Sequence, residues 1–173
     1  MQQQKIENLI NNGYEFDMNL YFNRGMQIFK ENMGQFVGYT AIYLLISIFG
    51  GSLASIIVSG PLMAGFYIVA NDIVRGEKPT FSKFFSGFNI FLPLFLANLI
   101  VGIFSALGFV LLIIPGIYLS VAYTFTIPFV IFLKMDFWDA MEASRKLITR
   151  NFWPFLGFVI ILLLINVVGL IML

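Results

Sequence analysis

The sequence lacks both cysteine and histidine in all of its 173 residues. Without these side chains the chain cannot form a disulfide or present a thiolate nucleophile. It also cannot supply the ligands of most zinc sites, the axial histidine of a haem, or a histidine switch at physiological pH. We therefore expect no cofactor and no bound metal.

Charged residues are scarce as well. They make up 11% of the chain and hydrophobic residues 60%, whereas soluble domains average about 25% and 45–50%. A soluble domain of ~150 residues buries only about 68–70% of the surface that its unfolded chain exposes, so it could not hide this much apolar surface. The composition predicts a membrane protein, and the net charge of +1 offers no basic field for a nucleic-acid partner.

Long uncharged runs locate the membrane spans. The run from Phe36 to Asp72 is about twice the ~20 residues that one helix needs to cross a bilayer. A second runs from Phe84 to Leu133, and a third follows Asn151. Glycine loosens a helix and proline suits the first turn of a new one. This predicts one break within the stretch from Gly50 and Gly51 to Gly60 and Pro61, and another at Pro115 and Gly116. The predicted spans lie near residues 36–56, 61–74, 90–110, 115–133 and 154–173.

Two amphipathic segments separate some of these runs. In the first, apolar residues recur at helical spacing at Phe22, Met26, Phe29, Met33 and Phe36. The second begins at Asp136, a predicted N-cap, and places Phe137, Ala140, Ser144, Leu147 and Ile148 on one face. This pattern is typical of helices that lie in the interface plane, although an ordinary core helix is the alternative.

The predicted fold class is therefore all-α. We expect a polytopic transmembrane helical bundle built of helical hairpins with interfacial amphipathic helices. A single membrane domain covers residues 1–173, of which 1–35 form the polar N-terminus and the first amphipathic helix. All ten basic residues fall before span one, between spans two and three, or between spans four and five. All nine acidic residues lie on the same side, with Asp72 at the end of span two. The positive-inside rule then predicts a multi-pass protein of the cell membrane with a cytoplasmic N-terminus.

Two short words match in spacing. Asn32, Phe36 and Gly38 open the first span, and Asn151, Phe155 and Gly157 open the last, with a weaker copy beginning at Asn89. The match predicts a hairpin repeat, unless it is a coincidence among residues that are common at membrane boundaries. A third hairpin break would fall beyond Leu173, so we expect the native chain to continue into a sixth span; five spans with an external C-terminus is the alternative.

Three stretches of the second half carry a family resemblance: residues 112–119 (LIIPGIYL), 129–132 (FVIF) and 138–153. They resemble the bacterial membrane-domain family that is fused or related to glycerophosphoryl diester phosphodiesterases, together with its stand-alone relatives of unknown function. The first half agrees only in layout. The resemblance implies six spans in three hairpins, a bacterial inner membrane, and an anchoring or accessory role, and no catalytic residue carries over.

Polar residues at the ends of spans and inside them are the candidate site residues. Asn71, Asp72 and Arg75 end span two, and Asn98 lies in span three. An ionisable group at a helix centre costs about 2.5–3.5 kcal/mol, which raises the hypothesis of a polar vestibule or ligand contacts. We favour a solvated or mutually paired boundary role for Asp72 and Arg75 and a helix–helix hydrogen bond for Asn98, with the vestibule as the alternative. On the second interfacial helix the candidates are Asp136, Trp138, Arg145 and Asn151.

Two weaker patterns concern packing. Gly34–Gly38 and Gly102–Ala106 have small residues at i and i+4, which allow helices to approach closely. Phenylalanines crowd the entry of span three, from Phe81 through Phe84 to Phe95. Near headgroups such aromatic residues most simply anchor a helix, and a lipid-binding groove is the alternative.

Three classes of function remain open. The first is a non-enzymatic accessory or scaffold module that engages membrane lipids or a soluble or membrane protein partner. The second is a transporter or permease component, since interrupted helices line many transport sites. The third is an intramembrane enzyme acting on lipid, which the sequence disfavours because the spans show no close Ser–Lys or Asp pair. The oligomeric state stays open.

Overall fold

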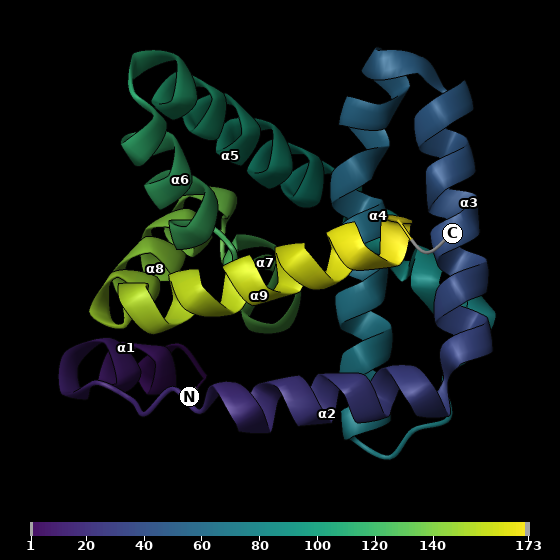
Figure 1. Cartoon of the computed structure of the whole chain (residues 1–173), viewed down its shortest axis with the longest axis horizontal. Coiled ribbons are helices and arrows are strands. Elements are labelled where there is room, and N and C mark those ends of the chain that lie inside the picture. The colour runs from purple at the N-terminus through teal and green to yellow at the C-terminus, as the bar shows by residue number, and fades with distance from the viewer. Residues whose placement is uncertain (1, 172–173) are drawn as a thin grey trace.

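A computed structural model of the chain describes residues 2–171, and these residues form helices and no strand (Figure 1). The all-α fold class is confirmed for this part of the chain. The elements are α1 Gln2–Asn12, α2 Met18–Glu31, α3 Met33–Phe49, α4 Gly51–Val74, the 3₁₀-helix η1 Phe81–Ile90, α5 Phe91–Leu111, α6 Ile113–Ala122, α7 Thr126–Leu133, α8 Phe137–Arg150 and α9 Phe152–Ile171.

Three stretches are long and apolar enough to cross a membrane: Leu53–Val74, Phe81–Leu111 and Ile113–Leu133. Two further pairs of helices pass the same test together but are bent, α2 and α3 by 89° and α8 and α9 by 99°. Counting each bent pair as one span gives up to five by length and composition. These lengths fit a multi-pass membrane protein.

The first break lies at Gly50 and Gly51, where the predicted stretch begins, and the prediction is wrong at Gly60 and Pro61. Gly51 has a φ of +72°, which glycine adopts without steric cost. Pro61 lies inside α4 and is fully buried. A Cβ on Gly60 would come within 2.5 Å of the Leu94 carbonyl oxygen, so this dipeptide marks close packing of α4 on α5. At the first two predicted spans, 36–56 and 61–74, the helices of the structure run over Met33–Phe49 and Gly51–Val74.

The second predicted break agrees with the structure in position. Leu112 is extended between α5 and α6, with φ −160° and ψ 142°, and Pro115 and Gly116 lie in the first turn of α6. Gly108 of α5 and Gly116 of α6 pack against each other. A Cβ on Gly108 would lie only 2.9 Å from the Gly116 Cα. The predicted span 115–133 agrees with the apolar stretch Ile113–Leu133, although three residues within it separate α6 from α7.

An aromatic core joins η1 to α3 and α4. A 3₁₀-helix has three residues per turn, so Phe84 and Gly87 share one face of η1, and both are buried there. Phe84 is fully buried and stacks on Tyr39 with ring centroids 4.4 Å apart. The Tyr39 hydroxyl donates a hydrogen bond to the Leu62 carbonyl at 2.8 Å. Phe84 is therefore a core residue and not the headgroup anchor that was predicted.

Close approach in this core depends on different glycines from those expected. Gly34 and Gly102 of the two small-residue pairs face open space. A Cβ on Gly65, in contrast, would meet the Phe84 carbonyl oxygen and lie 2.8 Å from the Tyr39 hydroxyl. Sequence spacing alone could not distinguish the two kinds of glycine, because the contact is made by a distant segment.

The two amphipathic helices pack differently. α2 buries no side chain and ends at Glu31, so Met33 and Phe36 belong to α3 and not to the face predicted for the first helix. α8 buries one whole face, with Ala140, Ser144 and Ile148 fully buried. It therefore has the packing of a core helix on that face, while its charged side remains accessible.

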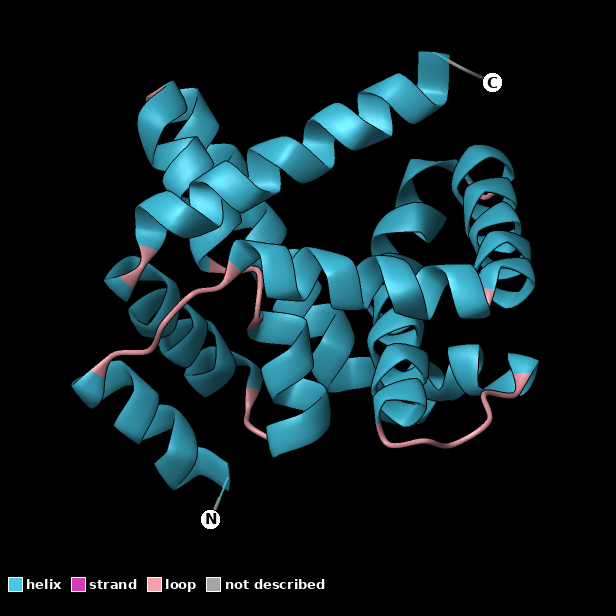
Figure 2. Ribbon diagram, turned by 60° about the horizontal axis from the view of Figure 1, so that its bottom comes forward, coloured by secondary structure: helices cyan, strands magenta, loops and turns pink. Residues whose placement is uncertain are grey.

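α9 runs across, and not along, the direction of α3 and α4 (Figure 1). Its closest packing is with α6 and α8, and its second half projects from the rest of the chain (Figure 2). Apolar side chains from Ile160 to Val167 are exposed there. The described helices thus do not form one parallel bundle, because α9 crosses the direction of α3 and α4. No described neighbour covers the second half of α9. The expected sixth span and residues 172–173 lie outside the described residues.

The glycine contact in the aromatic core can be tested by one added methyl group. We expect Gly65→Ala to lower the free energy of unfolding by about 1–3 kcal/mol, because the Cβ would push η1 away from α4. Gly102→Ala is the matched control in an open position and should be neutral or slightly stabilising. Equilibrium unfolding in mixed detergent micelles, followed by circular dichroism, measures both. Equal stability of the two variants would contradict the packing.

Candidate functional site

Asp72 does not pair with Arg75. Its carboxylate lies 3.1 Å from the Lys83 ammonium at the start of η1, and the Asp72 side chain is 12% exposed while that of Lys83 is 47% exposed. Arg75 is exposed and caps the end of α4, and Asn71 is half-buried. The pair ties the end of α4 to η1, next to the aromatic core.

Asn98 lies far from this ion pair. Its amide donates a hydrogen bond to the Ser59 hydroxyl at 2.7 Å, which links α5 to α4. Ser59 and Asp72 stand 13 positions apart on α4, or about 20 Å at 1.5 Å per residue. The structure does not bring Asn71, Asp72 and Asn98 into one vestibule. Asn98 instead makes a helix–helix hydrogen bond, the role that the sequence favours.

Ser144 holds the break between α6 and α7. Its hydroxyl donates to the Ala122 carbonyl at 2.7 Å and accepts from the Phe125 N–H at 3.0 Å. Both backbone groups would otherwise lose their partners inside the bundle. Ser144 was predicted on the apolar face of α8 without this role, although a lone hydroxyl among apolar residues on a buried face was a usable signal.

Thr126 begins α7 directly after this break. Its side chain is 1% exposed, and its hydroxyl has no hydrogen-bond partner among the described residues. A buried hydroxyl without a partner is uncommon. The interrupted helix therefore carries one polar group whose role the packing does not explain.

The end of α8 holds the N-terminal arm, which we define as residues 2–17. The Asn151 amide donates to the Tyr14 carbonyl at 2.7 Å, and the Tyr14 hydroxyl donates to the Leu147 carbonyl at 3.3 Å. The Arg150 guanidinium donates to the Ile10 carbonyl at 2.6 Å and also to the Asn11 carbonyl. Asn151, a candidate from the sequence, is thus a contact for the arm.

The beginning of α8 agrees with the sequence analysis. The Asp136 carboxylate accepts a hydrogen bond from the Trp138 N–H at 3.2 Å and caps the helix as predicted. Trp138 itself is exposed, and its ring meets Phe104 edge-on at 6.3 Å between centroids. Exposed tryptophan next to apolar helices is typical of a membrane interface.

Charges along the outer face of α8 compensate one another. The Arg145 guanidinium bonds both oxygens of Glu142, at 2.8 and 3.0 Å, and the Lys146 ammonium lies 3.2 Å from the same carboxylate. Hydrogen bonding from Arg145 lowers the pKa of Glu142, and the same contact raises the pKa of Arg145. The outer face of α8 keeps a net positive charge here, because two cations share one carboxylate. On the N-terminal arm, burial raises the pKa of the Tyr14 phenol.

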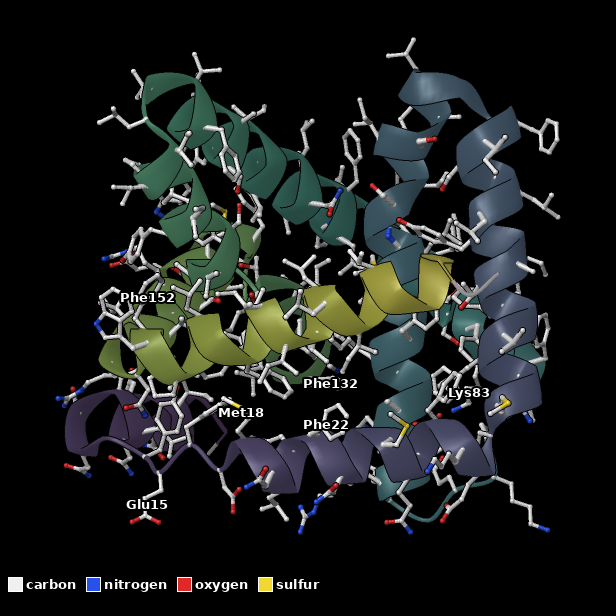
Figure 3. The ribbon with its side chains drawn as sticks, viewed as in Figure 1. Glu15, Met18, Phe22, Lys83, Phe132 and Phe152 are labelled. Atoms are coloured by element: carbon white, nitrogen blue, oxygen red, sulfur yellow. The ribbon has the colours of Figure 1, made fainter. Side chains whose placement is uncertain are left out.

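An apolar cleft of about 500 Å³ lies beneath the arm. Six aromatic side chains line it, from the arm, α2, the α6–α7 break and α9: Tyr14, Phe16, Tyr21, Phe125, Phe155 and Phe158. Leu9 and Leu147 add aliphatic surface, and Glu15 borders the cleft with its side chain pointing away from the bundle (Figure 3). The sequence analysis did not anticipate this cleft, because its walls come from segments that are distant in the chain.

The donor set for a metal is poor. No three side chains of aspartate, glutamate, histidine or cysteine cluster within the part of the chain that the structure describes. Comparison with protein-family models, with curated proteins and with solved structures finds no match to this chain. The resemblance to the phosphodiesterase-associated membrane domain therefore stays a prediction.

The double hydrogen bond of Ser144 predicts a specific instability. Ser144→Ala leaves a buried N–H and a buried C=O without their partner, at a cost of about 1–3 kcal/mol. Ser120→Ala is the matched control, because the Ser120 hydroxyl bonds only the Gly116 carbonyl of its own helix. We expect a lower unfolding midpoint in detergent for Ser144→Ala alone. A midpoint shift of the same size in Ser120→Ala would contradict this role of Ser144.

Proposed function

We propose that this chain is a non-enzymatic accessory module of the cell membrane, and that it engages lipid through a collar formed by α2 and α8 at the cytoplasmic face. The observation that carries the proposal is the pair of bends, 89° between α2 and α3 and 99° between α8 and α9. Each bend lays a charged amphipathic helix across the end of an apolar one. α2 buries no side chain, so its apolar face suits the interface plane. The apolar face of α8 packs on the protein, so α8 would present its charged face to the headgroups.

The two bends share their geometry. Asn32 and Asn151 both have a φ of −126°, with ψ of 24° and 43°, and each backbone N–H bonds the carbonyl three residues earlier. These are the asparagines that the two matching words share. The equivalence supports an internal repeat in which an amphipathic helix, a bend and an apolar helix follow in order. It also supports a common function for α2 and α8.

The distribution of charge supports a cytoplasmic collar. Arg24 and Lys30 lie on α2, and Arg145 and Lys146 lie on α8. The turns at the far ends of α3 and α5 are apolar, and Phe49 and Val110 are 81% and 82% exposed there. Basic residues gather on the cytoplasmic side of membrane proteins, so this arrangement favours an N-terminus inside the cell.

A transporter component is the second candidate. The interrupted helix α6–α7 and the buried hydroxyl of Thr126 favour it, because discontinuous helices place free backbone groups at substrate sites. Against this, Asp72 pairs with Lys83 at the end of α4 and not at its middle. A flux of ions or solutes through proteoliposomes that Thr126→Val abolishes would favour transport over the accessory role.

The absence of cysteine from the chain makes the collar testable by single labels. We expect a fluorophore on Phe22→Cys, on the apolar face of α2, to be quenched by phospholipids that carry a nitroxide near the headgroup. A fluorophore on the neighbouring Asn23→Cys, which is exposed, should be quenched several-fold less, because its side chain is turned about 100° away from the apolar face of the helix. Equal quenching of the two positions in nanodiscs would overturn the collar.

A further inference from the structure

The cleft beneath the N-terminal arm opens onto an apolar track along α9. Phe158 lines the cleft, and Leu162 and Ile165 follow it at helical spacing, four and then three residues later. Residues at this spacing lie on one face of a helix. Leu162 and Ile165 are both exposed, so the cleft wall continues into surface that would face the hydrocarbon of a bilayer.

The roof of the cleft is fixed in place. Asn151 and Arg150 donate hydrogen bonds to backbone carbonyls of the arm, and Tyr14 returns one to the Leu147 carbonyl. On the inner side, the Phe16 ring packs on Phe155 with centroids 4.3 Å apart. Contacts on both sides of the arm hold it over a space that its own side chains do not fill.

The chemistry of the walls selects an apolar occupant. Most of the lining is aromatic or aliphatic, and the volume of about 500 Å³ lies in the ~300–1,000 Å³ range of small-molecule sites. Water in such a space would find few hydrogen-bond partners. Polar groups occur at the outer edge, where Tyr21 is exposed and Glu15 points away from the bundle (Figure 3). Tyrosine is common at the level of lipid headgroups.

We propose that the cleft holds one acyl chain of a membrane phospholipid. The chain would enter sideways from the bilayer along the apolar track of α9, and the headgroup would remain at the edge beside Tyr21. This inference rests on the proposed function, because it needs the arm and α8 to lie at the membrane surface. It adds a specific site to a collar that otherwise contacts lipid only along its faces.

A photo-cross-linker in the cleft identifies the occupant by mass. We place p-benzoylphenylalanine at Phe158, wash the purified protein in detergent to remove loosely held lipid, and irradiate it. A phospholipid-mass adduct is expected at position 158 and not at the control position Leu163, which is exposed on α9. No adduct at 158, an equal yield at 163, a free fatty acid, or a cross-link to a second protein chain would overturn the proposal.

Filling the cleft with a bulkier side chain gives a second and independent test. Leu9→Trp adds bulk inside the cleft, and Leu20→Trp adds the same bulk on α2 outside the lining; the two leucines are 39% and 41% exposed. Native mass spectrometry after the same wash should show about one phospholipid on the wild-type protein and on Leu20→Trp. Retention should fall at least five-fold in Leu9→Trp. Equal retention by both variants would overturn the proposal.

The same samples separate this inference from the proposed function. In Leu9→Trp the fluorophore at Phe22→Cys should still be quenched by headgroup nitroxides, since the collar does not depend on the cleft. Loss of bound lipid with unchanged quenching supports both ideas. Lipid that stays bound in Leu9→Trp while quenching is normal overturns the cleft site alone. Absence of quenching at Phe22→Cys in the protein with its native Leu9 overturns the collar.

Discussion

Backbone hydrogen bonding away from water is the constraint on which the rest of this structure depends. Inside a bilayer every N–H and C=O needs a protein partner, so each place where a helix stops requires a local solution. At Asn32 and Asn151 the backbone turns while its N–H stays bonded three residues back. Between α6 and α7 the solution is the Ser144 hydroxyl, which serves a donor and an acceptor at once.

Close helix packing is the second consequence of the same environment. Lipid tails are as apolar as leucine, so helices associate through packing and through hydrogen bonds between them. Here Gly65 brings η1 close to α4, and Gly108 and Gly116 bring α5 close to α6. Tyr39 fills the remaining space with its ring and satisfies its hydroxyl at the Leu62 carbonyl. The N-terminal arm then reaches α8 through the hydrogen bonds of Arg150 and Asn151 and through the side chains of Ile6 and Ile10. The cleft lies beneath the arm.

The helical class and the spans of the second half were predictable from the sequence, because a run of uncharged residues needs no knowledge of its neighbours. Asp136 was predictable as a cap for the same reason. Pro61 was misplaced because its effect depends on whether a neighbouring helix approaches it, and here Gly60 and Gly87 allow that approach.

The candidate site was less predictable than the fold. Asp72 was predicted to be solvated or paired with Arg75, with a vestibule as the alternative, but its partner Lys83 comes from the next element. Asn98 bonds Ser59, which stands about 20 Å along α4 from Asp72 by the helix rise. The cleft required the arm to fold back onto α8 and α9, a contact between the two ends of the chain. Local patterns carry little signal for such contacts. The aromatic residues Tyr14 and Phe16 within a polar segment were a partial signal.

The most direct measurement of the central claim is the sidedness of single cysteines in the membrane. An impermeant maleimide added to intact cells should label Phe49→Cys and Leu112→Cys, at the far ends of the first two hairpins. It should label Asn23→Cys and Glu77→Cys only after the membrane is opened. Labelling of all four in intact cells, or the opposite pattern, would contradict a multi-pass chain whose collar faces the cytoplasm.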